Sequence, residues 1–210
     1  MTEALFTFTA LQNDALKETV NIGSGQAATS VFELTGQKVM IGIPLVGISN
    51  TQRLQRSLIR NDRHIVCFIN SFSGDIEGAA AWLMPRDAAD ALARLSWEHI
   101  KRHRHGRSYS MGLVHKEIAL ALTSGYLNAI NGLLGMTAGS SSPVAMAGSP
   151  HEVMNQVVWK YIKDPNRMIY IAINFEFVSA DAKRWGMFMI LPEAASVKAM
   201  LKRMILQRGA

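Results

Sequence analysis

The chain has 210 residues, of which 49% are hydrophobic and 18% are charged. This composition excludes a disordered chain, a collagen-like chain and a coiled coil, and it allows a sizeable buried core. The formal net charge of +6 favours an acidic partner, without choosing among nucleic acid, a membrane surface and a protein.

The first half of the chain predicts one long helix followed by strands. From 11 to 34, apolar or small residues recur at spacings of three and four, which indicates a helix. The residues after this helix predict a β-rich run over 38–48, broken only at Pro44, and then a polar, Arg-rich hairpin or loop over 50–63. Two strands follow, over 64–70 and 79–83, and the next helix begins at Pro85-Arg86-Asp87.

The second half repeats this order. It predicts a helix (111–134), a Gly/Ser/Pro-rich loop (137–150), two strands (168–177 and 185–191) and a last helix that opens at Pro192-Glu193. The segments 82–89 (WLMPRDAA) and 189–195 (MILPEAA) each run from an apolar strand through proline into a helix. We therefore predict an internally duplicated, pseudo-two-fold α+β domain, with an antiparallel sheet and two long helices on one face of it. A single domain over 1–210 would consist of repeats at about 11–100 and 110–208, joined by a basic linker near 101–109.

The first predicted helix has an apolar face and a polar face. At about 100° per residue, one face carries Leu16, Val20, Gly23 and Ala27. The opposite face carries Asp14, Glu18, Asn21 and Gly25. A solvated helix face would give the same pattern, and Asp14 would also suit an N-cap. The Gly23-Ser24-Gly25 tripeptide lacks the lysine spacing of a phosphate-binding loop, and its small residues predict a close approach of the helix to a sheet.

The polar face also follows a spaced motif. The motif consists of Asp14, three residues, Glu18, two residues, Asn21, twenty-two residues and Pro44. This spacing matches the pattern of the CheC/CheX/FliY phosphatases of bacterial chemotaxis. The segment Asp14–Thr29 as a whole also resembles the signature of that family. The segment 72–78 (FSGDIEG), followed by an apolar strand and a proline, also resembles this family. Four matched positions over 31 residues (14 to 44) are more specific than a single short motif.

The second half keeps only part of this motif. The same spacing there gives Leu113, Glu117, Leu120 and Pro143, so leucines replace the aspartate and the asparagine. A leucine cannot hydrogen-bond a water molecule. The resemblance is therefore to a CheC-like protein with only the first site intact, in which Glu117 is a relic or a structural acceptor.

The resemblance implies a hydrolase that acts on the aspartyl phosphate of CheY or a related response regulator. Asn21 would orient the attacking water, as a glutamine does in small GTPases. Glu18, one turn away, would pair with the active-site lysine of the regulator. Asp14 would extend the docking surface or only cap the helix, and Pro44 would shape the strand that supports the site.

The resemblance also implies that the partner supplies both the phosphate and the metal. We expect no metal or cofactor bound by this chain, with Mg²⁺ held by the phosphorylated regulator. A CheD-like protein and a second copy of the chain stay open as further partners. The loss of the second site motivates a different function, that of a non-catalytic adaptor on a response regulator, a CheD-like deamidase or the flagellar switch.

The strongest charge run, Lys101–Arg107, lies between the two repeats. It fits a solvated linker, a contact to an acidic partner or nucleic-acid binding. Aromatic residues are not interleaved in it, so we expect no nucleic-acid partner. His99 and His103 are four residues apart, but no further ligand is evident and no zinc site is predicted.

The sequence carries no transport signal. Residues 1–11 include Glu3 and no basic residue, unlike a secretory signal. No apolar stretch approaches the roughly 20 residues that span a bilayer. Cys67, the only cysteine, lies in an apolar run and is expected to be buried and inert. We therefore expect a cytoplasmic protein without membrane insertion.

Overall fold

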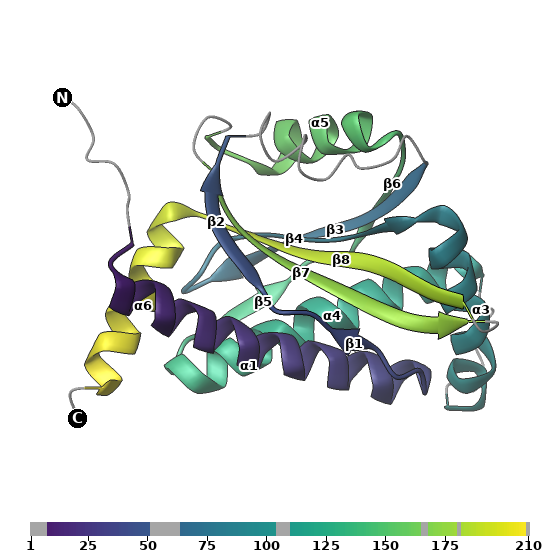
Figure 1. Cartoon of the computed structure of the whole chain (residues 1–210), viewed down its shortest axis with the longest axis horizontal. Helices are drawn as coiled ribbons and strands as arrows, with labels where there is room; N and C mark the ends of the chain where they lie inside the picture. Colours follow the sequence, from purple (N-terminus) through teal and green to yellow (C-terminus); the bar gives the residue numbers. More distant parts are fainter. Residues whose placement is uncertain (1–7, 51–63, 104–109, 165–167, 180–181, 209–210) are drawn as a thin grey trace.

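The computed structural model describes residues 8–50, 64–103, 110–164, 168–179 and 182–208. Figure 1 shows its elements, which in chain order are α1 (Ala10–Thr35), β1 (Met40–Ile41), β2 (Leu45–Ser49), β3 (Ile65–Gly74), β4 (Gly78–Pro85), α3 (Arg86–His103), α4 (Met111–Leu134), β5 (Ala138–Ser140), β6 (Val144–Gly148), α5 (Pro150–Tyr161), β7 (Met168–Ser179), β8 (Ala182–Pro192) and α6 (Ala194–Arg208). Both long helices and the four long strands lie where the sequence predicts them.

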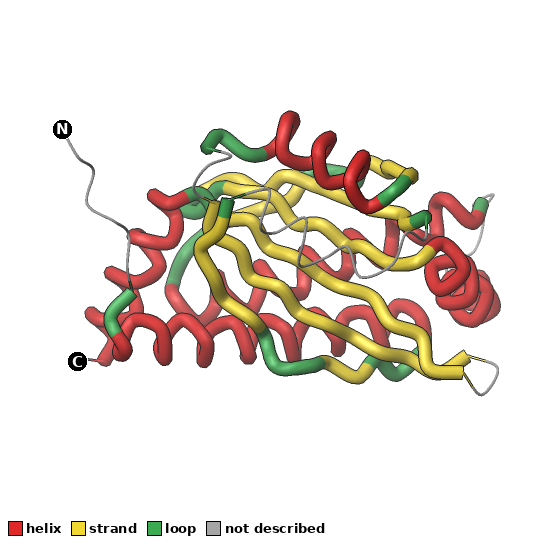
Figure 2. The backbone as a smooth tube through the Cα atoms, turned by 45° about the horizontal axis from the view of Figure 1, so that its top comes forward, coloured by secondary structure: helices red, strands yellow, loops and turns green. Residues whose placement is uncertain are grey.

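All strands belong to one antiparallel sheet, which Figure 2 shows as a continuous yellow layer. Its order is β1-β7-β8-β4-β3-β5, with β2 also paired to β7 and β6 also paired to β3. β4 and β8, one from each half, lie side by side at the centre. Each half places its short strands on the long strand of the other half, so the two halves are interleaved.

The sheet is covered on both faces. One core cluster lies between the sheet and the helices α1, α3, α4 and α6, and it contains Phe68, Trp82 and Ile171. The next residues along the strands, such as Cys67 and Ile69, point to the other face and pack against Val153 of α5. Alternation along a strand explains the two clusters, because successive side chains point to opposite faces. Burial on both faces explains the nearly continuous apolar runs of the central strands.

The duplication is visible in helix details 99 residues apart. Gly36 ends α1 and Gly135 ends α4, each with a left-handed backbone conformation that favours glycine (φ 68° and 60°). In each case the glycine N–H donates to the carbonyl oxygen four residues earlier. The buried hydroxyls of Ser24 and Thr123, also 99 residues apart, donate to the carbonyl oxygens of Val20 and Ala119.

The two long helices pack closely and antiparallel. A Cβ atom added at Gly23 of α1 would lie 2.8 Å from ring carbons of the buried Tyr126 of α4. A Cβ atom added at Gly125 of α4 would lie 2.5 Å from the hydroxyl oxygen of Ser30 of α1. The expectation that the small residues of α1 approach a sheet was therefore wrong, because Gly23 contacts a helix. Gly25 lies on the exposed side, with no atom within 4 Å of such a Cβ.

Three local expectations also need correction. The segment 137–150, expected to be a loop, contains β5 and β6, because its small residues complete the edge of the sheet next to β3. The helix α5 was not predicted, and it begins with a Ser149–Glu152 capping box. Asp14 is not an N-cap, because Thr9 caps α1 and its side chain accepts from the Gln12 N–H. Residues 51–63 of the expected hairpin or loop (50–63) and residues 104–109 of the expected linker lie outside the described residues.

The helix α4 carries a buried histidine, His115. The ring nitrogen Nε2 of His115 is 3.0 Å from the Ala89 carbonyl oxygen, and the ring contacts those of Phe68 and Trp82. Burial lowers the pKa of His115, while the Ala89 carbonyl and Asp90 partly offset this effect. The folded state therefore favours the neutral ring.

We expect a Gly23→Ala variant to unfold about 1–3 kcal/mol more easily than the wild type, because the added methyl group overlaps a buried ring. A Gly25→Ala variant should be unchanged or up to about 1 kcal/mol more stable, since alanine favours helix more than glycine. Urea unfolding followed by circular dichroism measures both. Equal effects of the two changes would contradict the close packing at Gly23.

Stability should fall as the pH drops below about 6.5, because the unfolded chain then binds a proton at His115 that the folded chain resists. A His115→Leu variant, which copies Leu16 of α1 (99 residues earlier), should show a flatter dependence of unfolding free energy on pH below about 6.5. A variant at the exposed His151, His151→Gln, serves as the control and should keep the wild-type slope. An unchanged slope in His115→Leu would contradict the assignment.

Candidate functional site

The first candidate site lies on the outer face of α1. Leu16 and Val20 are completely buried, and they fix the rotation of the helix against the core. Asp14, Glu18 and Asn21 are all exposed and lie on the opposite side, as the helical spacing predicts. Because the helix has 26 residues and is capped at both ends, these side chains stand on a rigid support in its N-terminal half.

Pro44 is buried behind this helix, between β1 and β2. Ile41 pairs with Phe175 and Leu45 with Ala172, so the edge strand carries one residue more than β7 across this interval. Such an irregular point in the strand tolerates proline, which has no N–H to donate. Since α1 contacts both β1 and β2, the irregularity helps to set the shape of the support beneath α1.

Pro143 occupies the corresponding place in the second half and is also buried. Ser140 pairs with Phe72 and Val144 with Ile69, which gives the same additional residue between β5 and β6. The backbone that carries the two prolines is therefore duplicated, whereas the helix side chains in front of them differ.

A groove of about 170 Å³ runs beside Glu18. Its lining residues come from the N-terminal half of α1, the C-terminal end of α4 and α6: Ala15, Glu18, Thr19, Ile22, Leu133, Leu134 and Met204. Glu18 is the one ionisable residue among them. The glutamate of the candidate site thus borders an apolar hollow between the two halves of the chain.

The second half has a different groove at the corresponding place. Glu117 and Leu120, both half-buried, line a hollow of about 400 Å³. The other lining residues are Ser30, Glu33, Leu34, Ile100, Ala121 and Ser124. Leu120 stands where Asn21 stands in the first half, so this groove offers no carboxamide to a bound water molecule.

The remaining chemical groups of the described residues give no competing centre. Burial raises the pKa of the Cys67 thiol to about 12, so the thiol stays protonated and unreactive at neutral pH. Among the residues that the structure describes, no cluster of three or more His, Cys, Asp or Glu residues is arranged to hold a metal ion. Within the same residues, no helix has both the length and the apolar character needed to cross a membrane.

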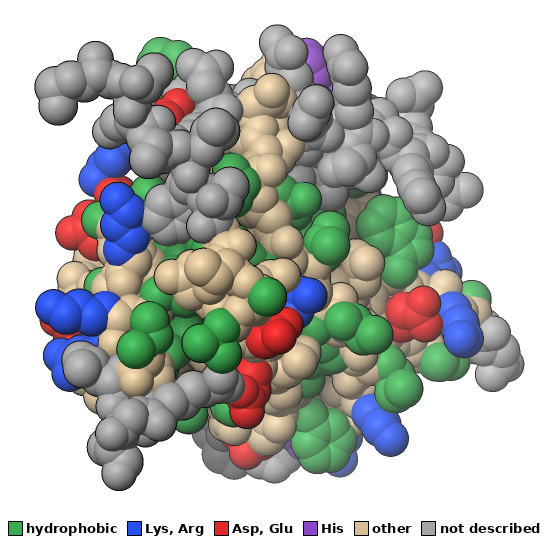
Figure 3. All heavy atoms as spheres, turned by 60° about the vertical axis from the view of Figure 1, so that its left-hand side comes forward, with side chains coloured by type: hydrophobic (Ala, Val, Ile, Leu, Met, Phe, Trp, Pro, Cys, Tyr) green, Lys and Arg blue, Asp and Glu red, His purple; other side chains and the backbone are tan. Residues whose placement is uncertain are grey.

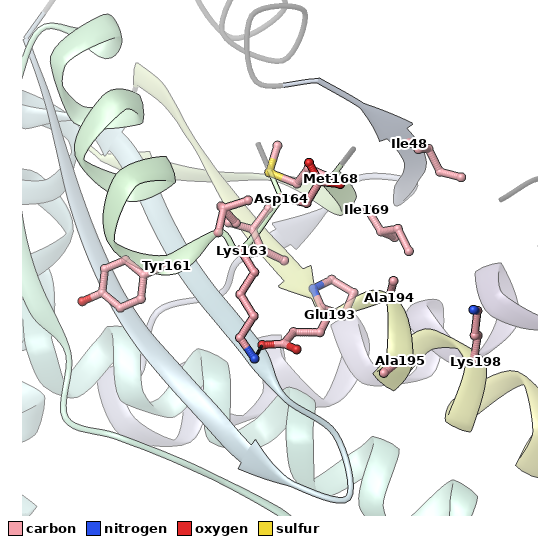
Figure 4. Close-up of a pocket in the computed structure, with 13 residues that line it drawn as sticks. Ile48, Tyr161, Lys163, Asp164, Met168, Ile169, Glu193, Ala194, Ala195 and Lys198 are labelled. Atoms are coloured by element: carbon pink, nitrogen blue, oxygen red, sulfur yellow. Dashed lines mark ion pairs between the residues drawn. The ribbon is translucent and has the colours of Figure 1, made fainter. Parts of the chain in front are cut away.

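A third hollow, of about 450 Å³, was not expected from the sequence (Figure 4). It lies between the end of α5, the start of α6 and β7. Lys163 reaches across it to Glu193, with 2.5 Å between Nζ and Oε1, and to Glu77 at 3.7 Å. The bond to Glu193 is the main cause of the raised pKa of Lys163. These charges pair with one another, so we assign this hollow no catalytic role.

Comparison of the fold with solved structures finds chemotaxis and flagellar proteins. Thermotoga maritima FliY matches with a TM-score of 0.71 and 17% identity, over 96% of this chain and 100% of that one. The FliM middle domain from H. pylori matches with a TM-score of 0.61 and 13% identity, over 93% and 99% of the two chains. The chemotaxis protein CheX from Desulfovibrio desulfuricans matches with a TM-score of 0.52 and 13% identity, over 83% and 99%. No protein-family model and no curated protein sequence matches this chain.

The chain has the fold of the CheC/CheX/FliY family. The match covers nearly the whole sequence, so both halves take part in this CheC-like fold. Its pseudo-two-fold sheet and paired long helices are the architecture predicted from the sequence. At these identities the likeness is one of fold, and the roles of Glu18 and Asn21 rest on the sequence motif together with their position on α1.

We expect an Asn21→Ala variant to change the free energy of unfolding by less than about 0.5 kcal/mol, because the side chain is exposed. A Leu16→Ala variant on the opposite side of the same helix should cost about 2–5 kcal/mol, because it leaves a cavity in the core. Thermal or urea unfolding compares them. A large destabilisation in Asn21→Ala would show that the residue is structural.

Proposed function

We propose that this protein is a phosphatase that accelerates hydrolysis of the aspartyl phosphate of CheY or a related response regulator. It would act in bacterial chemotaxis or a related two-component pathway, in the cytoplasm. The observation that carries the proposal is the exposed row of Asp14, Glu18 and Asn21 on a rigid helix of a CheC-like fold, at the spacing of the family motif.

The reaction needs a water molecule placed in line with the bond that breaks. The water oxygen bonds to phosphorus while the bond from phosphorus to the aspartyl oxygen breaks. The products are the free aspartate carboxylate and inorganic phosphate. Of the two protons of the water molecule, one stays on the new phosphate hydroxyl group and the other passes to a phosphate oxygen or to solvent. In this proposal, the Asn21 carboxamide accepts one hydrogen bond from the water and orients it towards phosphorus.

Glu18 supports this geometry from one turn away. Residues three apart on a helix are neighbours on its surface, so Glu18 and Asn21 can enter the same opening of a partner. We assign Glu18 to an ion pair with the lysine of the regulator's phosphorylation site, which fixes the depth at which the helix docks. Asp14 extends the same acidic surface by one further turn.

The partner supplies the remaining groups. The phosphate oxygens gain negative charge as the bond breaks, and the regulator's own Mg²⁺ and lysine stabilise that charge. We therefore propose that this chain contributes the water-positioning amide and the docking carboxylates, with no metal or cofactor of its own. Pro44 is assigned a supporting role, because it is buried and lies between the strands β1 and β2, which contact α1.

A non-catalytic adaptor is the second candidate function. The exchange of the motif residues for Leu113 and Leu120 shows that one half of this chain lacks the water-positioning group. The FliM middle domain has a similar fold, so the architecture is also found in a flagellar protein. Under this alternative, the acidic face of α1 binds a response regulator, a CheD-like deamidase or the flagellar switch without hydrolysis.

The decisive measurement is phosphate release from a phosphorylated CheY of the same cell in the presence of Mg²⁺. We expect the wild-type protein to accelerate release, and Asn21→Ala to lose about one to three orders of magnitude of that acceleration. The fold of the variant is checked by its unfolding curve, and a Gly25→Ala variant on the same face is the matched control with unchanged activity.

Equal release rates with wild type and Asn21→Ala would exclude the proposed role of Asn21. A complex without acceleration would instead support the adaptor, after the assay has been repeated with a CheD-like protein present. The same assay with a double variant, Leu113→Asp and Leu120→Asn, asks whether the second half regains activity once the motif is restored there.

A further inference from the structure

The carboxylates of the candidate site are bordered by exposed apolar side chains. Leu11 lies two turns before Glu18 on the same side of α1 and is 63% exposed, and Ile22 lies one turn after it and is 46% exposed. Leu133, from the end of α4, is 37% exposed and lines the same groove as Glu18 and Ile22. Figure 3 brings forward the side on which α1 begins and α6 lies, and it shows acidic side chains and a basic one near the centre with hydrophobic side chains on both sides of them.

The groove has the size of one large apolar side chain. Its volume of about 170 Å³ is close to that of a cavity that holds one benzene ring. Its walls include Ile22 and Leu133, which come from different halves of the chain, and the buried Met204 of α6 also lines it. Since both walls stand on long capped helices, the groove is formed before any partner binds.

The charge around the groove restricts what it can receive. Lysine and arginine are absent from the residues that line it, whereas Glu18 lies on its wall and Asp14 lies one turn away on the same helix. The corresponding groove of the second half has a larger volume, about 400 Å³, and its lining also includes carboxylates, those of Glu33 and Glu117. A partner that offers one apolar side chain next to a cation is complementary in charge and size to the smaller groove beside Glu18.

We propose that the Ile22–Leu133 groove receives one apolar side chain of the phosphorylated response regulator, from the surface next to the lysine that pairs with Glu18. This inference rests on the proposed function, which places the regulator on α1. It assigns a separate task to each part of the surface: Asn21 acts on the water, Glu18 pairs with the lysine, and the groove selects which regulator docks and in which orientation.

Ile22 and Leu133 are positioning residues under this proposal, because neither touches the reacting atoms. Burying one apolar side chain in a preformed groove strengthens binding of the substrate and the transition state equally. Its loss therefore raises the KM for the phosphorylated regulator and leaves kcat unchanged. The Asn21→Ala variant should do the reverse and lower kcat.

The test uses a Leu133→Ala variant, because Leu133 is on α4 and far in sequence from the site residues. We expect its KM for the phosphorylated regulator to rise about 10-fold or more with kcat unchanged, as loss of one interface anchor does. Ile22→Ala should behave in the same way, and the conservative Ile22→Met should retain most of the affinity. A Phe32→Ala variant is the matched control, because Phe32 is an exposed apolar residue of the same helix outside the groove.

Binding is measured in parallel by calorimetry with a beryllofluoride-activated regulator, which mimics the phosphorylated form without turnover. Wild-type affinity in Leu133→Ala and Ile22→Ala, or a loss equal to that of Phe32→Ala, would overturn the inference. A fall in kcat with unchanged KM would overturn it as well, because the groove would then act on the chemical step.

Failure of this inference and failure of the proposed function give different results. If Asn21→Ala abolishes activity while both groove variants behave as wild type, the phosphatase stands and the groove is not a docking site. If the wild type neither accelerates phosphate release nor binds the activated regulator, the proposed function fails and this inference fails with it.

Discussion

The antiparallel contact between α1 and α4 is the constraint on which the rest of the structure depends. Gly23 and Gly125 allow the two helices to approach so closely that neither position has room for a further carbon atom. That contact fixes the rotation of α1, so the side chains opposite Leu16 and Val20 must face outward. It also brings Leu133 of the second half next to Glu18 of the first. Both halves of the chain therefore contribute residues to the candidate site, although the motif residues Asp14, Glu18 and Asn21 all belong to the first half.

The two halves share a backbone and differ in the chemistry of one helix face. The glycine caps, the buried hydroxyls and the prolines at the sheet edge all recur. The fold requires the glycines and the prolines among these features, because each ends a helix or fits an irregular point of a strand. Side chains on an exposed helix face are under no such requirement, which is why Leu120 can replace a carboxamide without a change of architecture. Duplication of the scaffold and loss of a site are thus compatible.

The sequence predicted the long elements and the exposed face of α1, because periodicity and burial are linked directly. It failed where a residue's environment depends on distant parts of the chain. The short edge strands β5 and β6 consist mostly of alanine and glycine, so only their pairing with β3 identifies them. The element that contacts Gly23 could not be predicted, since a small residue indicates that another element approaches closely but not which element it is. The groove beside Glu18 was missed for the same reason, because its walls come from α1, α4 and α6.

The interleaved sheet has a consequence for the history of this chain. β2 pairs only with β7 and β6 only with β3, among the described strands, so each half needs the other to complete its edge. A protein of half this length would therefore have an unpaired long strand as a monomer, and would complete the same sheet as a symmetric homodimer with exchanged edge strands. Such a dimer must carry two identical sites. Joining both copies in one chain removes that obligation, and it allows the exposed faces of the two long helices to differ in sequence, as they do at Asn21 and Leu120.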